Sequence, residues 1–398
     1  MSWDKVKIGD CCEITSSKRI FFSEYVECGV PFYRSKEIIE SSNGQEISEP
    51  LFISQEKYDE IKRNFGVPQP GDMLLTSVGT IGVPYIVKED DYFYFKDGNL
   101  TWFRKFNNKL TSQYLYYWVR SAEGQGVLNN TTIGSSQKAL TIASLKGLEI
   151  PCPPVDVQGR IVEILYSYDA LIENNQKQIK LLEEAAQRLY KEWFVDLRFP
   201  GHKTTPITDG LPEGWTVQSM NDIAEYINGY AFKPTDWGTE GKPIIKIKEM
   251  GSGVTADTPR NTGEDIPKKY NVTAGDILFS WSATLSAMIW DEEDGLLNQH
   301  LFKVIPGEGI SREFVLQSIL KTLDEFSNLT TGSTMKHIQR GKLKEVKVNV
   351  PPTELMEQYR NISEPIREQI LNVKRQIILL REARDRLLPK LMNGENEV

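Results

Sequence analysis

Hydrophobic residues recur at alternating spacings of three and four along two separate stretches of the chain. Such spacing lines one stripe of a long helix and is typical of a coiled-coil seam. The first seam comprises Leu165, Tyr168, Ile172, Asn175, Ile179, Leu182, Ala186, Leu189 and Trp193. The second comprises Ser363, Ile366, Ile370, Val373, Ile377, Leu380, Arg384, Leu387 and Leu391. Each seam predicts a helix of about 35 residues, roughly 50 Å long at about 1.5 Å per residue.

The two seams belong to a longer internal repeat. QIKLLEEA at 178–185 recurs as QIILLREA at 376–383, which is 198 positions later (376 − 178). PFYRSKEI at 31–38 recurs as PIIKIKEM at 243–250 with a larger offset, so the loops differ in length. Solenoid repeats have periods of about 20 to 50 residues, so this repeat instead predicts two copies of one module about a pseudo-twofold axis. Each helix could pack on its own domain, but two matched seams favour an antiparallel pair, a stiff rod with a globular domain at each end.

Each copy of the module also contains short apolar runs between turn residues, which predict strands. Such runs are 73–76 and 92–95 in the first copy, and 276–280 and 300–305 in the second, while 113–119 and 312–321 look helical. The fold class is therefore α+β, with two mixed domains joined by two long helices. Pro-rich strips at 151–154 and 351–352 separate globular parts from helices. We expect domains at 1–152 and 200–350, the second including a linker, and helices at 153–199 and 351–398.

Composition limits the classes of function. The chain has 398 residues, 39% of them hydrophobic, and contains no apolar run long enough to span a membrane. Without a signal peptide pattern, we expect a cytoplasmic protein. Cys11, Cys12, Cys28 and Cys152 all lie in the first copy, so we interpret them as buried or incidental thiols. A net charge of −8 is unusual for a protein that binds nucleic acid alone.

The sequence shows no self-sufficient catalytic site. Neither a phosphate-binding loop nor a nucleophile elbow is present, and the three histidines lack metal-ligand spacing. NVPP at 349–352 has no aromatic residue after it and only superficially resembles an amino-methyltransferase motif. We therefore expect no catalytic residue, no metal and no cofactor bound by this chain.

Both domains carry polar loops whose hydroxyl, amide, imidazole and ammonium groups can hydrogen-bond phosphates and base edges. Ordinary turns have a similar composition, and only the recurrence in both domains favours binding. In the first domain the candidate DNA-binding residues are Lys36, Ser77, Thr80, Asn99, Thr132, Ser135, Ser136, Gln137 and Lys138. In the second they are Lys248, Ser280, Ser282, Thr284, Asn298, Gln299, His300, Thr330, Thr331, Ser333, Thr334, Lys336 and His337.

The helices and linkers resemble a known family. The segments that carry the resemblance are YDALIENN at 168–175, LLEE at 181–184, EWFVDLRFPG at 192–201, LPEGW at 211–215 and LLPKLMNGE at 387–395. They are similar to the DNA-specificity subunit of type I restriction-modification systems. The domains resemble this family only in layout, through Gly71-Asp72, Gly275-Asp276 and the Thr-Gly-Ser loops.

The resemblance implies two target-recognition domains that each read half of a bipartite, asymmetric DNA target, with the coiled coil setting the spacer. It also implies partners: two modification subunits that methylate adenine N6 with S-adenosylmethionine, and restriction subunits that use ATP and Mg. Partners that clamp the DNA could supply the positive charge that this chain lacks. Two alternatives stay open: the specificity subunit of a system that cuts on both sides of its target, and a coiled-coil adaptor that binds protein.

Overall fold

In the computed structural model, residues 3–45, 47–132, 138–328 and 340–395 are described. They form two compact units, residues 1–176 with 375–398 and residues 177–374. Both division points fall inside the long helices α6 (Val155–Tyr190) and α11 (Thr353–Met392), so each unit contains one mixed domain and part of each helix. None of the described helices has the length and apolarity that a bilayer crossing needs.

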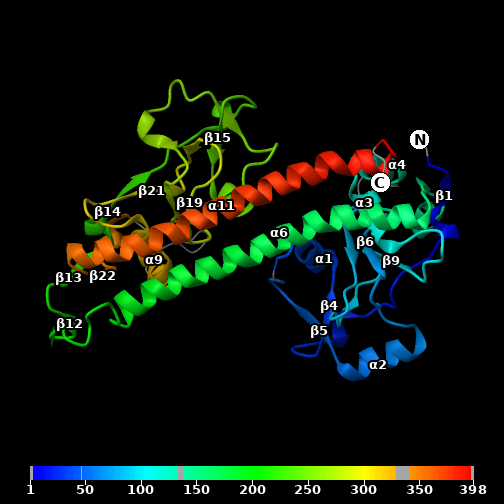
Figure 1. Cartoon of the computed structure of the whole chain (residues 1–398), viewed down its shortest axis with the longest axis horizontal. Coiled ribbons are helices and arrows are strands. Elements are labelled where there is room, and N and C mark those ends of the chain that lie inside the picture. Colours follow the sequence, from blue (N-terminus) through cyan, green and yellow to red (C-terminus); the bar gives the residue numbers. More distant parts are fainter. Residues whose placement is uncertain (1–2, 46, 133–137, 329–339, 396–398) are drawn as a thin grey trace. The chain divides into compact units, whose positions relative to one another are not determined.

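The described residues of unit 1 form two small sheets and one closing strand pair, and Figure 1 shows several of their strands. The central sheet is antiparallel, with the order β2 (Glu13–Thr15), β9 (Leu100–Arg104), β6 (Met73–Thr76), β7 (Pro84–Ile86). The second sheet has the order β3 (Tyr25–Val26), β5 (Leu51–Ile53), β4 (Val30–Tyr33), β8 (Tyr94–Phe95). β1 (Lys5–Lys7) pairs with β10 (Glu149–Pro151), so the domain begins and ends at one place.

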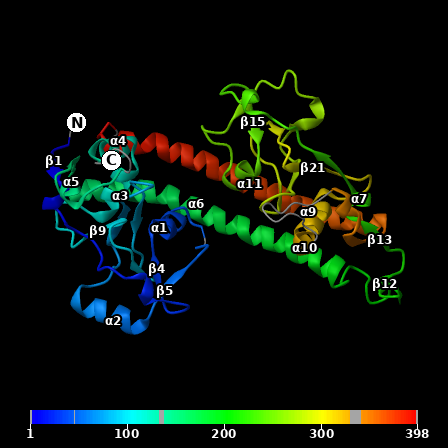
Figure 2. The ribbon, with the colours of Figure 1, turned by 180° about the vertical axis from the view of Figure 1, so that it is seen from behind.

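Helices cover these sheets. They are α1 (Ser35–Ser42), α2 (Gln55–Asn64), α3 (Ser112–Arg120), α4 (Ala122–Thr131) and α5 (Ile142–Lys146). Figures 1 and 2 show β4 and β5 between α1 and α2. The largest core of this unit joins the central sheet and α3 to the two long helices, through residues such as Trp118, Leu165 and Leu391.

Unit 2 repeats this plan. Its central sheet has the order β14 (Ala224–Asn228), β21 (Leu301–Pro306), β18 (Ile277–Ser280), β19 (Ser286–Ile289). Its second sheet has the order β16 (Arg260–Asn261), β15 (Lys242–Ile245), β20 (Gly295–Leu297), β17 (Asn271–Val272). β13 (Thr216–Ser219) pairs with β22 (Lys347–Val350), as β1 pairs with β10. The remaining elements are β11 (Ile207–Thr208), β12 (Leu211–Pro212), α7 (Met220–Ile223), α8 (Ile247–Ser252), α9 (Arg312–Lys321) and α10 (Leu323–Asn328).

Matching strand pairs relate the two domains, although the edge strand of the second sheet differs, since β3 pairs with β5 whereas β17 pairs with β20. β4 and β8 are parallel, with Phe32 opposite Tyr94, and β15 and β20 are parallel, with Ile244 opposite Leu296. The repeated Gly-Asp pairs have the same structural role. Gly71 and Gly275 have φ of 86° and 98°, and the following Asp72 and Asp276 accept hydrogen bonds from the backbone N–H three residues earlier, at 2.9 and 2.8 Å. The repeat is thus a structural one, as the sequence predicted.

The predicted seams are also confirmed, because all eighteen seam side chains are buried or half-buried. In unit 1, Asp169 of α6 forms an ion pair with Arg384 of α11, and Asn175 hydrogen-bonds Gln376 at 3.3 Å. Residue numbers rise along one helix as they fall along the other, so the helices run antiparallel. In unit 2, α6 passes into a π-helical turn (Lys191–Val195) whose Trp193 and Phe194 pack against Tyr359 of α11.

The four cysteines are free, as expected. Cys11 and Cys12 are buried, and burial raises the pKa of Cys12 to about 12, so its thiol is protonated at neutral pH. Cys28 is exposed and Cys152 is half-buried.

Candidate nucleic-acid interface

Three candidate loops of the first domain meet at one edge of its central sheet. The backbone N–H of Ser77, just after β6, donates to the carbonyl oxygen of Asn99 at 2.8 Å. The N–H of Leu140 in turn donates to the carbonyl oxygen of Ser77 at 2.9 Å, and Val78 pairs with Ala139. These bonds bring the turn after β6, the loop before β9 and the segment from Lys138 onward together.

The side chains at this edge have different surroundings. Ser77 is buried, and its hydroxyl bonds the Leu75 carbonyl at 3.2 Å and the Thr101 hydroxyl at 2.7 Å, so it supports the loops from inside. Thr80 and Lys138 are exposed, while Asn99 and Thr132 are half-buried. The Thr132 hydroxyl donates to the carbonyl of Asn129 at 2.8 Å. Thr80, Asn99 and Lys138 are therefore the side chains best placed for an external ligand.

The second domain has a corresponding cluster, built around an imidazole. His300 Nδ1 lies 3.2 Å from the Ser282 hydroxyl, and its Nε2 lies 3.4 Å from Gln299 Nε2. Its ring also lies against Trp281, with centroids 5.7 Å apart, and the Trp281 indole N–H donates to Asn228 Oδ1 at 3.0 Å. Strand registers place His300 directly before β21, as Asn99 is placed directly before β9. Asn99 and His300 were both candidates predicted from the sequence, whereas Trp281 and Asn228 were not.

The other candidates of this domain divide into buried and exposed groups. Ser280 is fully buried, and its hydroxyl donates to the carbonyls of Ser282 and Thr284 at 3.2 and 2.7 Å, so it stabilises the turn. Asn298 is also buried, and its N–H donates to the carbonyl oxygen of Ile245 at 3.0 Å. The Thr284 side chain is exposed.

Several candidates lie outside the described residues, and their DNA-binding role stays a prediction. They are Ser135, Ser136, Gln137, Thr330, Thr331, Ser333, Thr334, Lys336 and His337. In unit 1, the described chain resumes at Lys138, and Leu140 bonds Ser77 at the same edge as Asn99.

The repeated motif at 31–38 and 243–250 proves to be a strand followed by a capped helix. The buried Glu37 accepts a hydrogen bond from the Arg34 backbone N–H at 2.6 Å, and the buried Glu249 accepts one from Lys246 N–H at 3.1 Å. Each carboxylate thus caps the helix that begins next to it. The signal was visible in the sequence as a cation followed three residues later by Glu.

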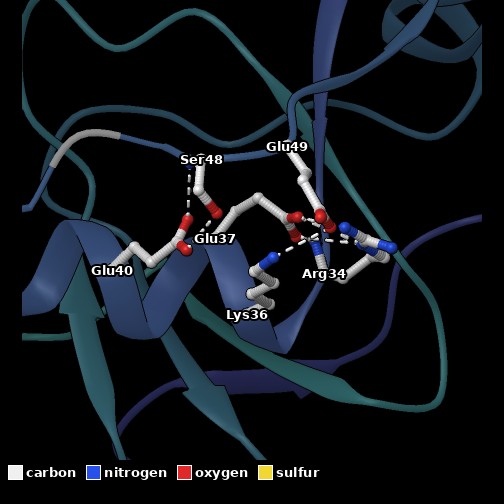
Figure 3. Close-up of polar contacts among 6 residues, drawn as sticks. All are labelled: Arg34, Lys36, Glu37, Glu40, Ser48 and Glu49. Carbon is white, nitrogen blue, oxygen red and sulfur yellow. Dashed lines mark hydrogen bonds and ion pairs between the residues drawn. The ribbon is translucent and has the colours of Figure 1, made fainter. Parts of the chain in front are cut away.

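The two candidate lysines of this motif differ in their partners. Lys36 Nζ lies 2.9 Å from Glu49 Oε2, and this carboxylate raises the pKa of Lys36 (Figure 3). The equivalent residue of the second domain, Lys248, is exposed and forms no ion pair with any residue that the structure describes. The role of Glu49 could not be predicted from the sequence, because a loop brings it to Lys36 from 13 positions away.

The first domain gathers hydroxyl, amide and ammonium groups along one edge of its central sheet, and the second gathers hydroxyl, amide and imidazole groups along the corresponding edge. Such groups can hydrogen-bond phosphates and base edges. In the described part of the chain, no group of three or more His, Cys, Asp or Glu side chains could hold a metal ion.

Comparisons with known proteins agree with this arrangement. The family model described as "Type I restriction modification DNA specificity domain" matches residues 1–184 and 212–371, which is once in each copy of the repeat. The MjaIX type I restriction enzyme specificity subunit of Methanocaldococcus jannaschii is 26% identical over 429 residues, covering 100% of this chain and 94% of that protein. The putative MjaX specificity subunit of that organism is 23% identical over 419 residues, with the same coverages.

Structural comparison supports the fold. The crystal structure of the type I restriction-modification S subunit from M. genitalium aligns with a TM-score of 0.57 at 15% sequence identity, covering 98% of this chain and 96% of that one. The chain therefore belongs to the family of type I restriction-modification DNA-specificity proteins. It is a specificity subunit and not itself an enzyme, and the two alternative functions left open by the sequence are not favoured.

Proposed function

We propose that each mixed domain reads one half of a bipartite DNA target and that the two long helices set the spacer between the halves. The observation that carries this proposal is the equivalence of Asn99 and His300 at the same edge of two homologous sheets. We call the sheet edge that carries Asn99 or His300 the reading edge of its domain. Two reading edges with different side chains suit two different half-sites. Because both helices pass from one unit into the other, their length would control how far apart the half-sites lie.

The chemistry on DNA would belong to partner subunits. We propose two modification subunits that transfer a methyl group from S-adenosylmethionine to adenine N6, and restriction subunits that use ATP and Mg. Phosphate contacts from these partners would offset the net charge of −8, since DNA affinity depends strongly on cationic groups near the backbone.

A repeated exposed stripe on the helices fits two copies of one partner. Leu181 in unit 2 and Leu379 in unit 1 occupy equivalent positions in the repeat and are 65% and 63% exposed. Each is followed on the same face by exposed Ala and Arg side chains, Ala185 with Arg188 and Ala383 with Arg386. The seam requires only buried positions to recur. Recurrence of exposed ones favours an external ligand, and we assign one modification subunit to each stripe.

The docking proposal is tested by replacing each exposed leucine with lysine and weighing the complex by native mass spectrometry. L181K should lose one modification subunit, L379K the other, and the double variant both. Leu171 is a matched control, because it is 51% exposed on α6 while its repeat position holds Gln369. Loss of a subunit in L171K, or full occupancy in the double variant, would contradict the assignment.

The reading proposal is tested by methylating a library of randomised duplexes with the assembled complex and sequencing the products. We expect two short specified blocks separated by unread base pairs of constant number. The isolated chain should methylate nothing. A single contiguous target, or methylation without sequence preference, would overturn the proposed function.

A further inference from the structure

A carboxylate occupies the cationic end of α1 in the first domain (Figure 3). Lys36 Nζ lies 2.9 Å from Glu49 Oε2, and Arg34 is the next cation to act on Glu49, whose pKa is lowered by Lys36 first and Arg34 after it. The Arg34 guanidinium is held in turn by buried Glu37, which its Nε approaches to 3.1 and 3.2 Å. These two cations and two carboxylates balance, and Glu40 of the same helix adds a further carboxylate close to Lys36 and Glu49.

A second contact holds the loop that carries Glu49. The Ser48 hydroxyl donates to Glu40 Oε1 at 2.6 Å, and the Ser48 backbone N–H donates to Glu40 Oε2 at 3.1 Å. Glu40 lies on α1 itself, so the helix positions the residue next to Glu49 as well as the lysine that Glu49 meets. The carboxylate is thereby kept close to the two cations although its side chain is 72% exposed.

The site borders the reading edge of the domain. The Ser35 hydroxyl at the start of α1 donates to the carbonyl oxygen of Asn99 at 3.5 Å, and the N–H of Lys96 donates to the carbonyl oxygen of Tyr33 at 2.8 Å. Lys36 and Arg34 therefore lie beside the loop that precedes β9. A cation beside a loop that is proposed to read bases is well placed to contact the DNA backbone, because phosphate contacts fix the register of a protein on its duplex.

We propose that Lys36 and Arg34 form a DNA phosphate site, and that Glu49 occupies the place of the phosphate until DNA displaces it. The inference rests on the proposed function. Replacing one anion by another leaves the net charge of the cluster unchanged. The exchange is also cheap, because the Lys36 and Glu49 side chains are 44% and 72% exposed and ion pairs of this kind contribute little. Glu49 would thus weaken binding to all DNA about equally and leave sequence reading to the neighbouring loops.

The second domain provides a natural comparison. Strand registers, with Phe52 opposite Pro31 and Arg260 opposite Pro243, make Asp257 the counterpart of Glu49. Asp257 is exposed, and within the described residues it forms no ion pair with Lys248. A carboxylate paired with the lysine of this motif is therefore a feature of the first domain. Asp257→Asn is a control, because it removes one negative charge from the position equivalent to Glu49.

The test measures the affinity of the assembled complex for a duplex carrying the selected target and for a scrambled duplex of equal length. E49Q should tighten binding to both by about two- to fivefold, the equivalent of one surface ion pair. K36A should weaken binding to both and lower the salt slope by about one. In the K36A background E49Q should no longer tighten binding, and D257N should leave the affinity unchanged.

Wild-type affinity in E49Q would overturn the inference. So would a gain that persists without Lys36 or that D257N reproduces, because each would mark a general charge effect. All of these results would leave the bipartite target intact. The proposed function fails separately, through the loss of any two-block preference in the methylation selection.

Discussion

At the scale of single residues, the two domains carry different side chains at equivalent positions of the fold. Asn99 and His300 stand at one position of the shared fold, and their neighbours differ accordingly. Behind the first lies a buried hydroxyl pair, Ser77 with Thr101, whereas Trp281 and Phe302 pack together in the second domain. The residues that pack behind Asn99 are thus polar, whereas those behind His300 are aromatic.

This correspondence predicts separable effects on target choice. H300A should relax preference only in the half-site of the second domain, and N99A only in that of the first, by about 1–3 kcal/mol for a lost base contact. S280A is the control, because its buried hydroxyl bonds only backbone carbonyls and should affect stability alone. Randomised-duplex selection with each variant complex measures the change, and an altered preference in the opposite half-site would refute the assignment.

Sequence reasoning located these positions but not their surroundings. Asn99 and His300 were predicted as candidates because polar loops recur in both copies. That the Ser77 and Ser280 hydroxyls are buried could not be predicted, since a serine in a turn can point either way. The Lys36–Glu49 pair depends on the path of a loop, for which the hydrophobic pattern contains no signal.

At the scale of elements, each unit has a polar joint between its domain and a long helix. In unit 1, Asp169 of α6 accepts hydrogen bonds from Tyr117 and Arg120 of α3 at 2.8 and 3.0 Å. In unit 2 the equivalent position is Arg367 of α11, which forms two hydrogen bonds of 3.0 Å with Glu313 of α9. The helix contributes the anion in one unit and the cation in the other.

The joint of unit 2 should be sensitive to the loss of one partner. Glu313 is 2% exposed at its side chain, so R367A would leave a buried carboxylate without its cation, at a cost of about 3–5 kcal/mol. The double variant R367M/E313M should be much closer to wild type, because it removes both charges together. R386A, a change at an 83% exposed cation of the same helix, should cost less than about 0.5 kcal/mol. Urea unfolding compares the three, and equal losses in the single and double variants would contradict this account.

Elements were the most predictable level. The predicted helix at 312–321 is α9 residue for residue, and the residues of both seams are buried or half-buried as expected. Helical periodicity extends over many residues and therefore tolerates local noise. The strand pairs that close each domain were not predicted, because β1 and β10 come from segments more than 140 residues apart.

At the scale of the whole molecule, the reversed charges make the two halves unequal. In unit 1, Asp169 faces Arg384, and the repeat makes Ala186 the counterpart of Arg384 and Arg367 that of Asp169. Two copies of residues 1–201 would therefore set Ala186 opposite Asp169, which keeps Tyr117 and Arg120. Two copies of residues 202–398 would instead set Arg384 opposite Arg367.

We therefore expect residues 1–201 to pair and, with modification subunits, to read a palindromic target. Residues 202–398 should pair poorly, and R384A should improve their pairing by removing the like-charge contact. Analytical ultracentrifugation of the three proteins measures this order. Equal dimerisation of both halves would show that the ion pairs do not influence partner choice.

The helices also allow a test of spacer control. Deleting 170–176 and 371–377 removes one heptad from each helix and preserves both seams, Leu181, Leu379 and both joints. The pair shortens by about 10 Å, roughly three base pairs at about 3.4 Å each. Selection on randomised duplexes should give the same two blocks with a shorter spacer, and an unchanged spacer at full affinity would refute the idea.

The strand pairs that close each domain have a consequence for inheritance. Lys5 lies opposite Pro151, and Thr216 opposite Val350, so each domain enters and leaves its helices at a single place. A crossover between two genes of this family on either side of such a pair would transplant a complete domain without cutting its sheets. The recipient would acquire a new half of its target in one genetic event, while its helices and their partners stayed the same.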